Sequence, residues 1–155
     1  MIIGAGLLSA AEQANPRLNV IVLLADDMGW NGPSSFGSDL HRTPNLDQLA
    51  QRGMKFTNAY AACTVCSPTR AAMMTGKYPA RLHLTDWIAG QNRPWEILSI
   101  PDWNKRLELS ETTIAEALKK RGYRTAHVGK WHLGSKGHMP ENQGFDINVG
   151  GTLSG

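Results

Sequence analysis

Two adjacent carboxylates follow an apolar run near the start of the chain. Asp26 and Asp27 come directly after residues 19–25, which read NVIVLLA. Ligands in open α/β sheets bind at the carboxyl ends of strands, and two neighbouring carboxylates suit a hard divalent cation such as Ca²⁺ or Mg²⁺. Side chains alternate along a strand, so both carboxylates can converge only if the backbone bends there. A solvated turn or a helix cap is the alternative interpretation.

A cysteine and an arginine lie four residues apart at the start of a predicted helix. Cys66 precedes Ser67 and Pro68, which are typical of a helix N-terminus, and Arg70 projects from the same face. Backbone N–H groups and the helix dipole favour negative charge at this end. The pair indicates a sulfur nucleophile beside an oxyanion site, whereas the plainer interpretation is a small buried cysteine and a surface arginine.

Cys63 and Cys66 form a CxxC pair and are the only cysteines of the chain. A CxxC is typical of a thioredoxin-like redox pair or of half a zinc site. No second CxxC and no HxxxH supplies the other zinc ligands, and the SPTR that follows at residues 67–70 points away from a redox motif.

Lys130 and His132 lie two residues apart at the end of a predicted strand, a spacing that allows them to point to the same side. The lysine supplies a fixed positive charge, and the histidine can carry a proton near neutral pH. A salt-bridging lysine and a packed histidine are the alternative. The remaining histidines are given no role: His41, His83, His127 and His138.

The elements that must position these residues alternate between strands and helices. The pattern predicts strands at 19–25, 54–61 and 123–128 and helices at 44–52, 68–75 and 114–121. Thr43, Ser67 and Thr113 are the expected caps, and Thr113 forms a capping box with Glu116. This order indicates an α/β fold. Residues 77–110 are rich in Pro, Trp and Asn and predict a long irregular connection.

Composition and charge narrow the class of protein. The 155 residues are 41% hydrophobic and 19% charged, which fits a single globular domain. The net charge of +3 is spread along the chain, without the basic stripe that nucleic-acid binding requires. No run approaches the roughly 20 apolar residues of a membrane span. Residues 1–14 contain a short apolar core followed by SAA, which is typical of the remnant of a secretory signal peptide.

Three motifs together resemble one family. Residues 66–76, CSPTRAAMMTG, match the signature of type I sulfatases: Cys, any residue, Pro, a small residue, Arg, four residues, a small residue and Gly. Residues 122–132, GYRTAHVGKWH, match the second family signature. The segment DDMGW at 26–30 resembles the opening metal strand of the family, and TPNLD at 43–47 the helix after it. The chain is similar to a formylglycine-dependent sulfatase of the alkaline phosphatase superfamily from residue 19 to residue 146.

The resemblance implies a nucleophile and a metal. Cys66 would be oxidised to formylglycine by a maturation enzyme that reads Pro68 and Arg70. Asp26, Asp27 and the modified Cys66 would bind Ca²⁺ or Mg²⁺. One hydroxyl of the formylglycine hydrate would attack sulfur, and the second would allow sulfate to leave. A serine at position 66 would instead be left as a stable sulfate ester.

The resemblance also implies roles for three basic residues. Arg70 would steady the hydrate and the metal, Lys130 would bind a sulfate oxygen, and His132 would hydrogen-bond the hydrate and act as a base in sulfate release. These groups would together form the preorganised positive site that a sulfuryl group requires.

The implied architecture is an alkaline-phosphatase-like α/β/α sandwich with a mostly parallel central sheet, of which residues 15–155 would form an incomplete N-terminal part. The family's remaining metal ligands and leaving-group acid would lie beyond Gly155. The chain by itself is therefore expected to be poorly stable and to have little sulfatase activity.

Substrate and location follow from the same resemblance. A sulfated carbohydrate or an aryl sulfate is the expected substrate, and a periplasmic or secreted protein is expected. The tryptophans of residues 82–103 fit either a sugar site or the packing of a long loop. Two alternatives stay open: a phosphate or phosphonate ester hydrolase of the same superfamily, and an inactive fragment.

Overall fold

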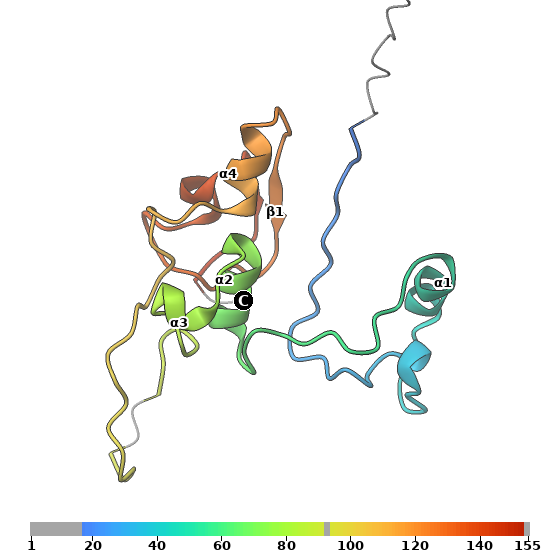
Figure 1. Cartoon of the computed structure of the whole chain (residues 1–155), viewed down its shortest axis with the longest axis horizontal. Coiled ribbons are helices and arrows are strands. Elements are labelled where there is room, and N and C mark those ends of the chain that lie inside the picture. The colour runs from blue at the N-terminus through green and yellow to red at the C-terminus, as the bar shows by residue number, and fades with distance from the viewer. Residues whose placement is uncertain (1–16, 92–93, 154–155) are drawn as a thin grey trace, which may run out of the picture.

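The computed structural model describes residues 17–91 and 94–153. Helices predominate over strands in this part of the chain. Figure 1 shows α2, α3, α4 and β1 gathered in one body, with α1 standing apart from them. In chain order, the elements are the 3-10 helix η1 (Ser34–Phe36), α1 (Pro44–Arg52), α2 (Cys66–Thr75), α3 (Pro79–Leu82), α4 (Ile114–Lys119), β1 (Ala126–Val128), the 3-10 helix η2 (Pro140–Gln143) and β2 (Ile147–Val149).

The sheet consists of β1 and β2, which are parallel. Ala126 pairs with Ile147 and Val128 with Val149. The ladder continues past the strand ends, because Gly129 N–H donates to the Val149 carbonyl at 2.8 Å. The strand predicted at 123–128 is thus confirmed over its last three residues, while β2 was not predicted. Parallel strands together with helices confirm the α/β class.

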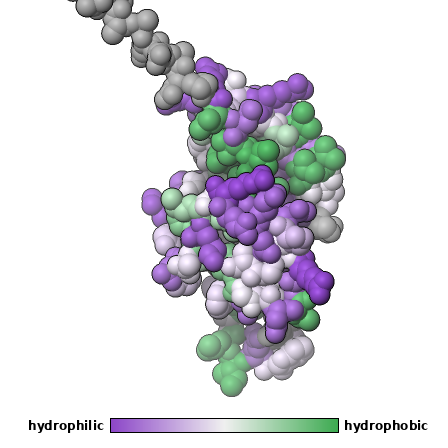
Figure 2. All heavy atoms as spheres, turned by 90° about the vertical axis from the view of Figure 1, so that its right-hand side faces the viewer, coloured by the Kyte–Doolittle hydropathy of each residue, from purple (hydrophilic) through white to green (hydrophobic). Residues whose placement is uncertain are grey.

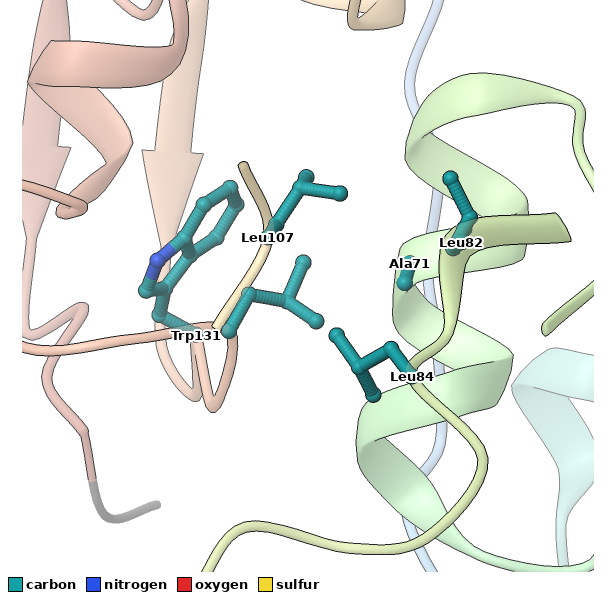
Figure 3. Close-up of a cluster of buried hydrophobic side chains, with 6 residues drawn as sticks. Ala71, Leu82, Leu84, Leu107 and Trp131 are labelled. Carbon is teal, nitrogen blue, oxygen red and sulfur yellow. The ribbon is translucent and has the colours of Figure 1, made fainter. Parts of the chain in front are cut away.

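The buried core lies between α2 and the chain that follows β1 (Figure 3). Trp131 and Leu133 pack from that chain toward Ala71 of α2. The remaining core leucines are Leu82, Leu84 and Leu107. These three come from the two ends of residues 77–110. The described part of this connection, 77–91 and 94–110, is mostly irregular, as predicted, yet it is anchored in the core at both ends. Its short helix α3 was not predicted.

The cap of α4 forms as the sequence predicts. The Thr113 hydroxyl accepts from the Glu116 N–H, and the Glu116 carboxylate accepts from the Thr113 N–H. Two of the helix's otherwise unpaired donors are satisfied in this way. Helix α1 also has its predicted bounds, but Thr43 makes no side-chain cap bond. Its hydroxyl instead contacts the Ser34 hydroxyl at 2.8 Å, which joins α1 to η1.

Helix α2 begins earlier than predicted. Val65, with φ −124° and ψ 164°, occupies the cap position, and Cys66 is the first helical residue. The expected cap of Ser67 is therefore wrong. The Ser67 hydroxyl is used elsewhere, accepting from the Ile88 N–H at 3.0 Å. The helix ends at Gly76, whose φ of 68° suits a residue without a side chain.

Two predicted strands do not form in the described part of the chain. Residues 19–25 and 54–61 are assigned to no strand. Residues 20–24 are instead between 41% and 82% exposed. A strand needs a neighbour for its backbone N–H and C=O groups, and the ladder here joins β1 to β2 only. Figure 2 shows apolar side chains gathered in patches on one face of the molecule.

The predicted signal-peptide remnant at residues 1–14 lies outside the described residues. Among the residues that are described, no helix combines the length and the apolar character needed to cross a membrane.

Candidate functional site

Cys66 and the two carboxylates line one pocket of about 200 Å³. Arg70 and Cys63 line the same pocket. Its walls come from the bend at residues 26–27 and from the first turn of α2. The structure therefore brings together four of the residues that the sequence singled out: Asp26, Asp27, Cys66 and Arg70.

Asp26 is held by two cations. Arg70 donates from Nη2 to Asp26 Oδ2 at 2.7 Å, and Lys130 donates from Nζ to Asp26 Oδ1 at 2.9 Å. The Arg70 hydrogen bond, and after it Lys130, lowers the pKa of Asp26 below its usual value, although burial opposes this. Asp26 therefore stays ionised well into the acidic range.

Arg70 links the acidic pair to the second signature. Its Nη1 donates to the Lys130 carbonyl at 2.5 Å while Nη2 binds Asp26. The side chain of Arg70 is only 9% exposed, and those of Asp26 and Lys130 are 26% and 24% exposed. A planar guanidinium can serve two acceptors at fixed angles, which an ammonium cannot do.

Asp27, which lines the pocket, turns the chain there. Its φ is +57°, in the left-handed region that Asp tolerates better than most residues. The bend ends the side-chain alternation of the extended residues before it. It therefore allows Asp26 and Asp27 to line the same pocket, as the convergence of two adjacent carboxylates requires.

The N-terminal turn of α2 is tied to its surroundings by two hydroxyl groups. Thr69 Oγ1 donates to the Cys63 carbonyl at 2.7 Å, and Ser67 is fully buried against Ile88. These bonds fix the segment on both sides of Cys66. The sequence did not predict these hydrogen bonds of Ser67 and Thr69, although both residues lie within the signature motif.

Lys130 and His132 do not face the same pocket. Lys130 reaches Asp26, whereas the buried His132 contacts the Ile88 carbonyl through Nε2. The shared side that their spacing allows is therefore not used in this structure. Strand β1 ends at Val128, and positive φ values at Gly129 and His132 turn the chain, so strand alternation no longer applies.

A second cavity, of about 450 Å³, separates residues 19–24 from β1. Val22 and Leu24 line one wall, and His127 and Val128 line the other. Burial, followed by the nearby Arg70 charge, lowers the pKa of His127 below its usual value. His127 packs edge-on against Trp131 at 5.1 Å between ring centroids, which fits a neutral structural imidazole.

The pocket that contains Cys66 offers oxygen ligands of the type that a hard cation prefers. Asp26 and Asp27 offer carboxylate oxygens, the ligands that Ca²⁺ and Mg²⁺ prefer. Within residues 17–91 and 94–153, no group of three or more histidine, cysteine or acidic side chains is arranged to hold a metal ion. A Ca²⁺ ion takes about six to eight oxygens, so this pair would form only part of its coordination sphere.

Comparison with known proteins adds an independent finding. The family model described as Sulfatase matches residues 18–154. Rat arylsulfatase G is 39% identical over 142 residues, which cover 91% of this chain and 25% of the relative. Rat N-acetylgalactosamine-6-sulfatase is 42% identical over 146 residues, covering 91% and 26% respectively. The chain thus spans about a quarter of the length of these relatives.

A solved structure is also similar to this chain. The crystal structure of Ps i-CgsB in complex with k-i-k-neocarrahexaose superposes with a TM-score of 0.65 at 32% identity, over 81% of this chain and 27% of that one.

Proposed function

Because the chain belongs to the sulfatase family, we propose that it supplies the nucleophile-bearing part of a sulfuric ester hydrolase. The observation that carries this proposal is the convergence of Cys66, Asp26, Asp27 and Arg70 on one pocket. Sulfuryl transfer requires a nucleophile next to groups that stabilise the charge on the sulfuryl oxygens. The names of the relatives, which are sulfatases, favour sulfate over phosphate esters.

Cys66 is the proposed precursor of the nucleophile. Formylglycine made from it by a maturation enzyme would supply, as its hydrate, two hydroxyls on one carbon, one to attack sulfur and one to release sulfate. At the N-terminus of α2, the side chain at position 66 lies beside backbone N–H groups that the helix does not use. These donors would face the oxygens of the entering sulfate group.

Arg70 and Lys130 are the proposed charge-stabilising residues. Both are bound to Asp26, and Arg70 also lines the Cys66 pocket. Asp26 and Asp27 would hold a divalent cation, for which we propose Ca²⁺ or Mg²⁺, and the bound ion would polarise the sulfuryl group. With a cation held by the two carboxylates, Arg70 and Lys130 would be the side chains that bind sulfate oxygens.

His132 is proposed as a proton carrier in sulfate release. Its ring is buried and in contact with the Ile88 carbonyl. Reaching the nucleophile would require this contact to open.

We propose a sulfated carbohydrate as the substrate and a periplasmic or secreted location. The neocarrahexaose held by one structural neighbour and the amino sugar in the name of one relative support the carbohydrate. An aryl sulfate should also react, because the sulfuryl group is the part that the pocket residues would bind.

Trapping the sulfuryl group on a serine tests the proposal. Cys66→Ser leaves one hydroxyl at the position of the nucleophile and cannot expel sulfate. Incubation with 4-nitrocatechol sulfate and Ca²⁺ should add one sulfuryl group to the intact mass, located at residue 66 by fragmentation. A single transfer per molecule suffices, so even slow chemistry is detected.

Cys66→Ala is the control and should gain no mass. Lys130→Ala in the serine background should slow the transfer. A serine variant that stays unmodified after prolonged incubation, or that is phosphorylated by 4-nitrophenyl phosphate and not sulfated, would overturn the proposal.

A further inference from the structure

Cys63 is the half of the CxxC pair that the proposed function does not use. It lines the same pocket of about 200 Å³ as Cys66. Both cysteines are half-buried, both carry free thiols, and the chain contains no third cysteine. We propose that Cys63 and Cys66 form a reversible disulfide, which is a modification site distinct from the oxidation of Cys66 to formylglycine.

Local contacts hold the two residues at the same end of α2. Cys66 is the first residue of the helix, and the residues before it, 62–65, form a series of bends. Thr69, in the first turn of the helix, donates to the Cys63 carbonyl at 2.7 Å. This hydrogen bond ties the backbone of Cys63 to the helix that carries Cys66, and both residues line the same small pocket.

The chemistry is thiol–disulfide exchange with an external disulfide, either a small molecule such as glutathione disulfide or a disulfide oxidoreductase. One cysteine thiolate attacks the external disulfide and displaces one reduced thiol. The second cysteine then attacks the mixed disulfide, forms the Cys63–Cys66 S–S bond and displaces a second reduced thiol. Two electrons pass to the external disulfide, and the two protons of the cysteine thiols end on its reduced products.

A consequence for maturation follows, and it rests on the proposed function. Conversion to formylglycine requires a free thiol at Cys66, so the disulfide form would be withheld from it. Cys63 would then set the fraction of chains that can mature under a given redox condition. This holds only where the compartment permits disulfides.

Differential alkylation measures the disulfide directly. The folded 155-residue chain is equilibrated with mixtures of reduced and oxidised glutathione, quenched with acid, alkylated and digested with trypsin. Residues 56–70, between Lys55 and the cleavage after Arg70, contain both cysteines. We expect a peptide that carries no alkyl group and is lighter by two hydrogen atoms, with its abundance rising as the glutathione becomes more oxidised.

Variants distinguish the Cys63–Cys66 disulfide from other reactions of the two thiols. Cys63→Ser should leave Cys66 alkylated or singly glutathionylated. Thr69→Val should lower the equilibrium constant for the disulfide by about two- to tenfold, the range expected for the loss of one hydrogen bond. The exposed Thr112→Val is the matched control and should have no effect. In concentrated urea, the Thr69 variant and the wild type should become equal.

Two results would overturn the proposal: both cysteines alkylated in every glutathione mixture, or only mixed disulfides and intermolecular dimers. Coexpression with a formylglycine-generating enzyme, with and without Cys63→Ser, then tests the consequence for maturation. If the disulfide forms but Cys66 is never converted to formylglycine, the proposed function is contradicted while the disulfide proposal still holds. Conversion that is insensitive to Cys63 would remove the regulatory consequence.

Discussion

Replacing Arg70 should destabilise the contacts of the site strongly. Its guanidinium joins Asp26 to the Lys130 carbonyl through bonds of 2.7 and 2.5 Å. Arg70→Ala deletes both bonds and leaves a carbonyl and a carboxylate short of a donor. We therefore expect the free energy of unfolding of the chain to fall.

The size of the loss follows from burial. Breaking a fully buried ion pair costs about 3–5 kcal/mol, whereas exposed pairs contribute about 0–1 kcal/mol. Arg70 is 9% exposed but its partner Asp26 is 26% exposed, and Asp26 keeps Lys130. An intermediate loss of about 2–3 kcal/mol is therefore expected for Arg70→Ala.

The chain offers a matched control in Arg106, which pairs with Glu108 at 3.1 Å with side chains 55% and 39% exposed. Arg106→Ala should cost at most about 0.5 kcal/mol. The assay is urea unfolding followed by tryptophan fluorescence, since Trp131 is fully buried. High salt should weaken the Arg106 pair more than the Arg70 pair.

A double-mutant cycle isolates the pair. In an Asp26→Asn background, Arg70→Ala should cost about 1–2 kcal/mol less than in the wild type, because one of its partners is already lost. If the cost of Arg70→Ala matched that of Arg106→Ala, or did not depend on Asp26, the ion-pair account would be refuted.

Further predictions concern the core and the titrating groups. Leu84→Ala should lower the free energy of unfolding by about 2–4 kcal/mol, whereas the exposed Leu98→Ala should be almost neutral in the same urea assay. The hydrogen bond from Lys119, followed by that from the Thr125 N–H, lowers the pKa of Asp146 to about 2. The contribution of Asp146 to stability is therefore present above its unfolded pKa of 3.8 and is lost as the pH falls toward 2. Lys119→Ala should raise the carboxyl pKa of Asp146 measured by ¹³C NMR, and an unchanged value would contradict the ion pair. Burial lowers the pKa of His127 below 6.5, so the folded state loses stability as the pH falls below that value. His127→Gln should flatten the pH dependence of the unfolding free energy on the acid side of pH 6.5, and an unaltered slope would show that the buried imidazole does not cause it.

Local signals in the sequence were sufficient for the start of α4 and for the end of α2. The capping box at Thr113 and the glycine after residue 75 depend on contacts within a few residues, and the structure has both. The start of α2 was misplaced because Ser67 bonds to Ile88, 21 residues away, and not to its own helix. Such a contact leaves no periodic pattern to recognise.

Strands were harder to predict, because they depend on partners. The run 19–25 has the composition of a buried strand, but in the described residues its backbone has no ladder to join. β2 was missed because INV at 147–149 is short and follows a glycine-containing turn. Motif spacing singled out Asp26, Cys66 and Arg70, which line one pocket, and Lys130, which contacts Asp26. The separation of His132 from Lys130 was not predicted, since it follows from the positive φ angles at Gly129 and His132, which turn the chain beyond β1.

The central claim is that Cys66 is the precursor of the nucleophile, and the mass of its peptide tests this most directly. The chain is coexpressed with a formylglycine-generating enzyme, and the tryptic peptide of residues 56–70 is weighed and treated with an aldehyde-specific hydrazide. We predict a lighter peptide in which an aldehyde oxygen replaces the sulfur and two hydrogen atoms of Cys66, labelled by the hydrazide, and its absence in Cys66→Ala. A peptide in which Cys66 stays an unmodified thiol, although the enzyme converts a control substrate in the same cells, would contradict the account.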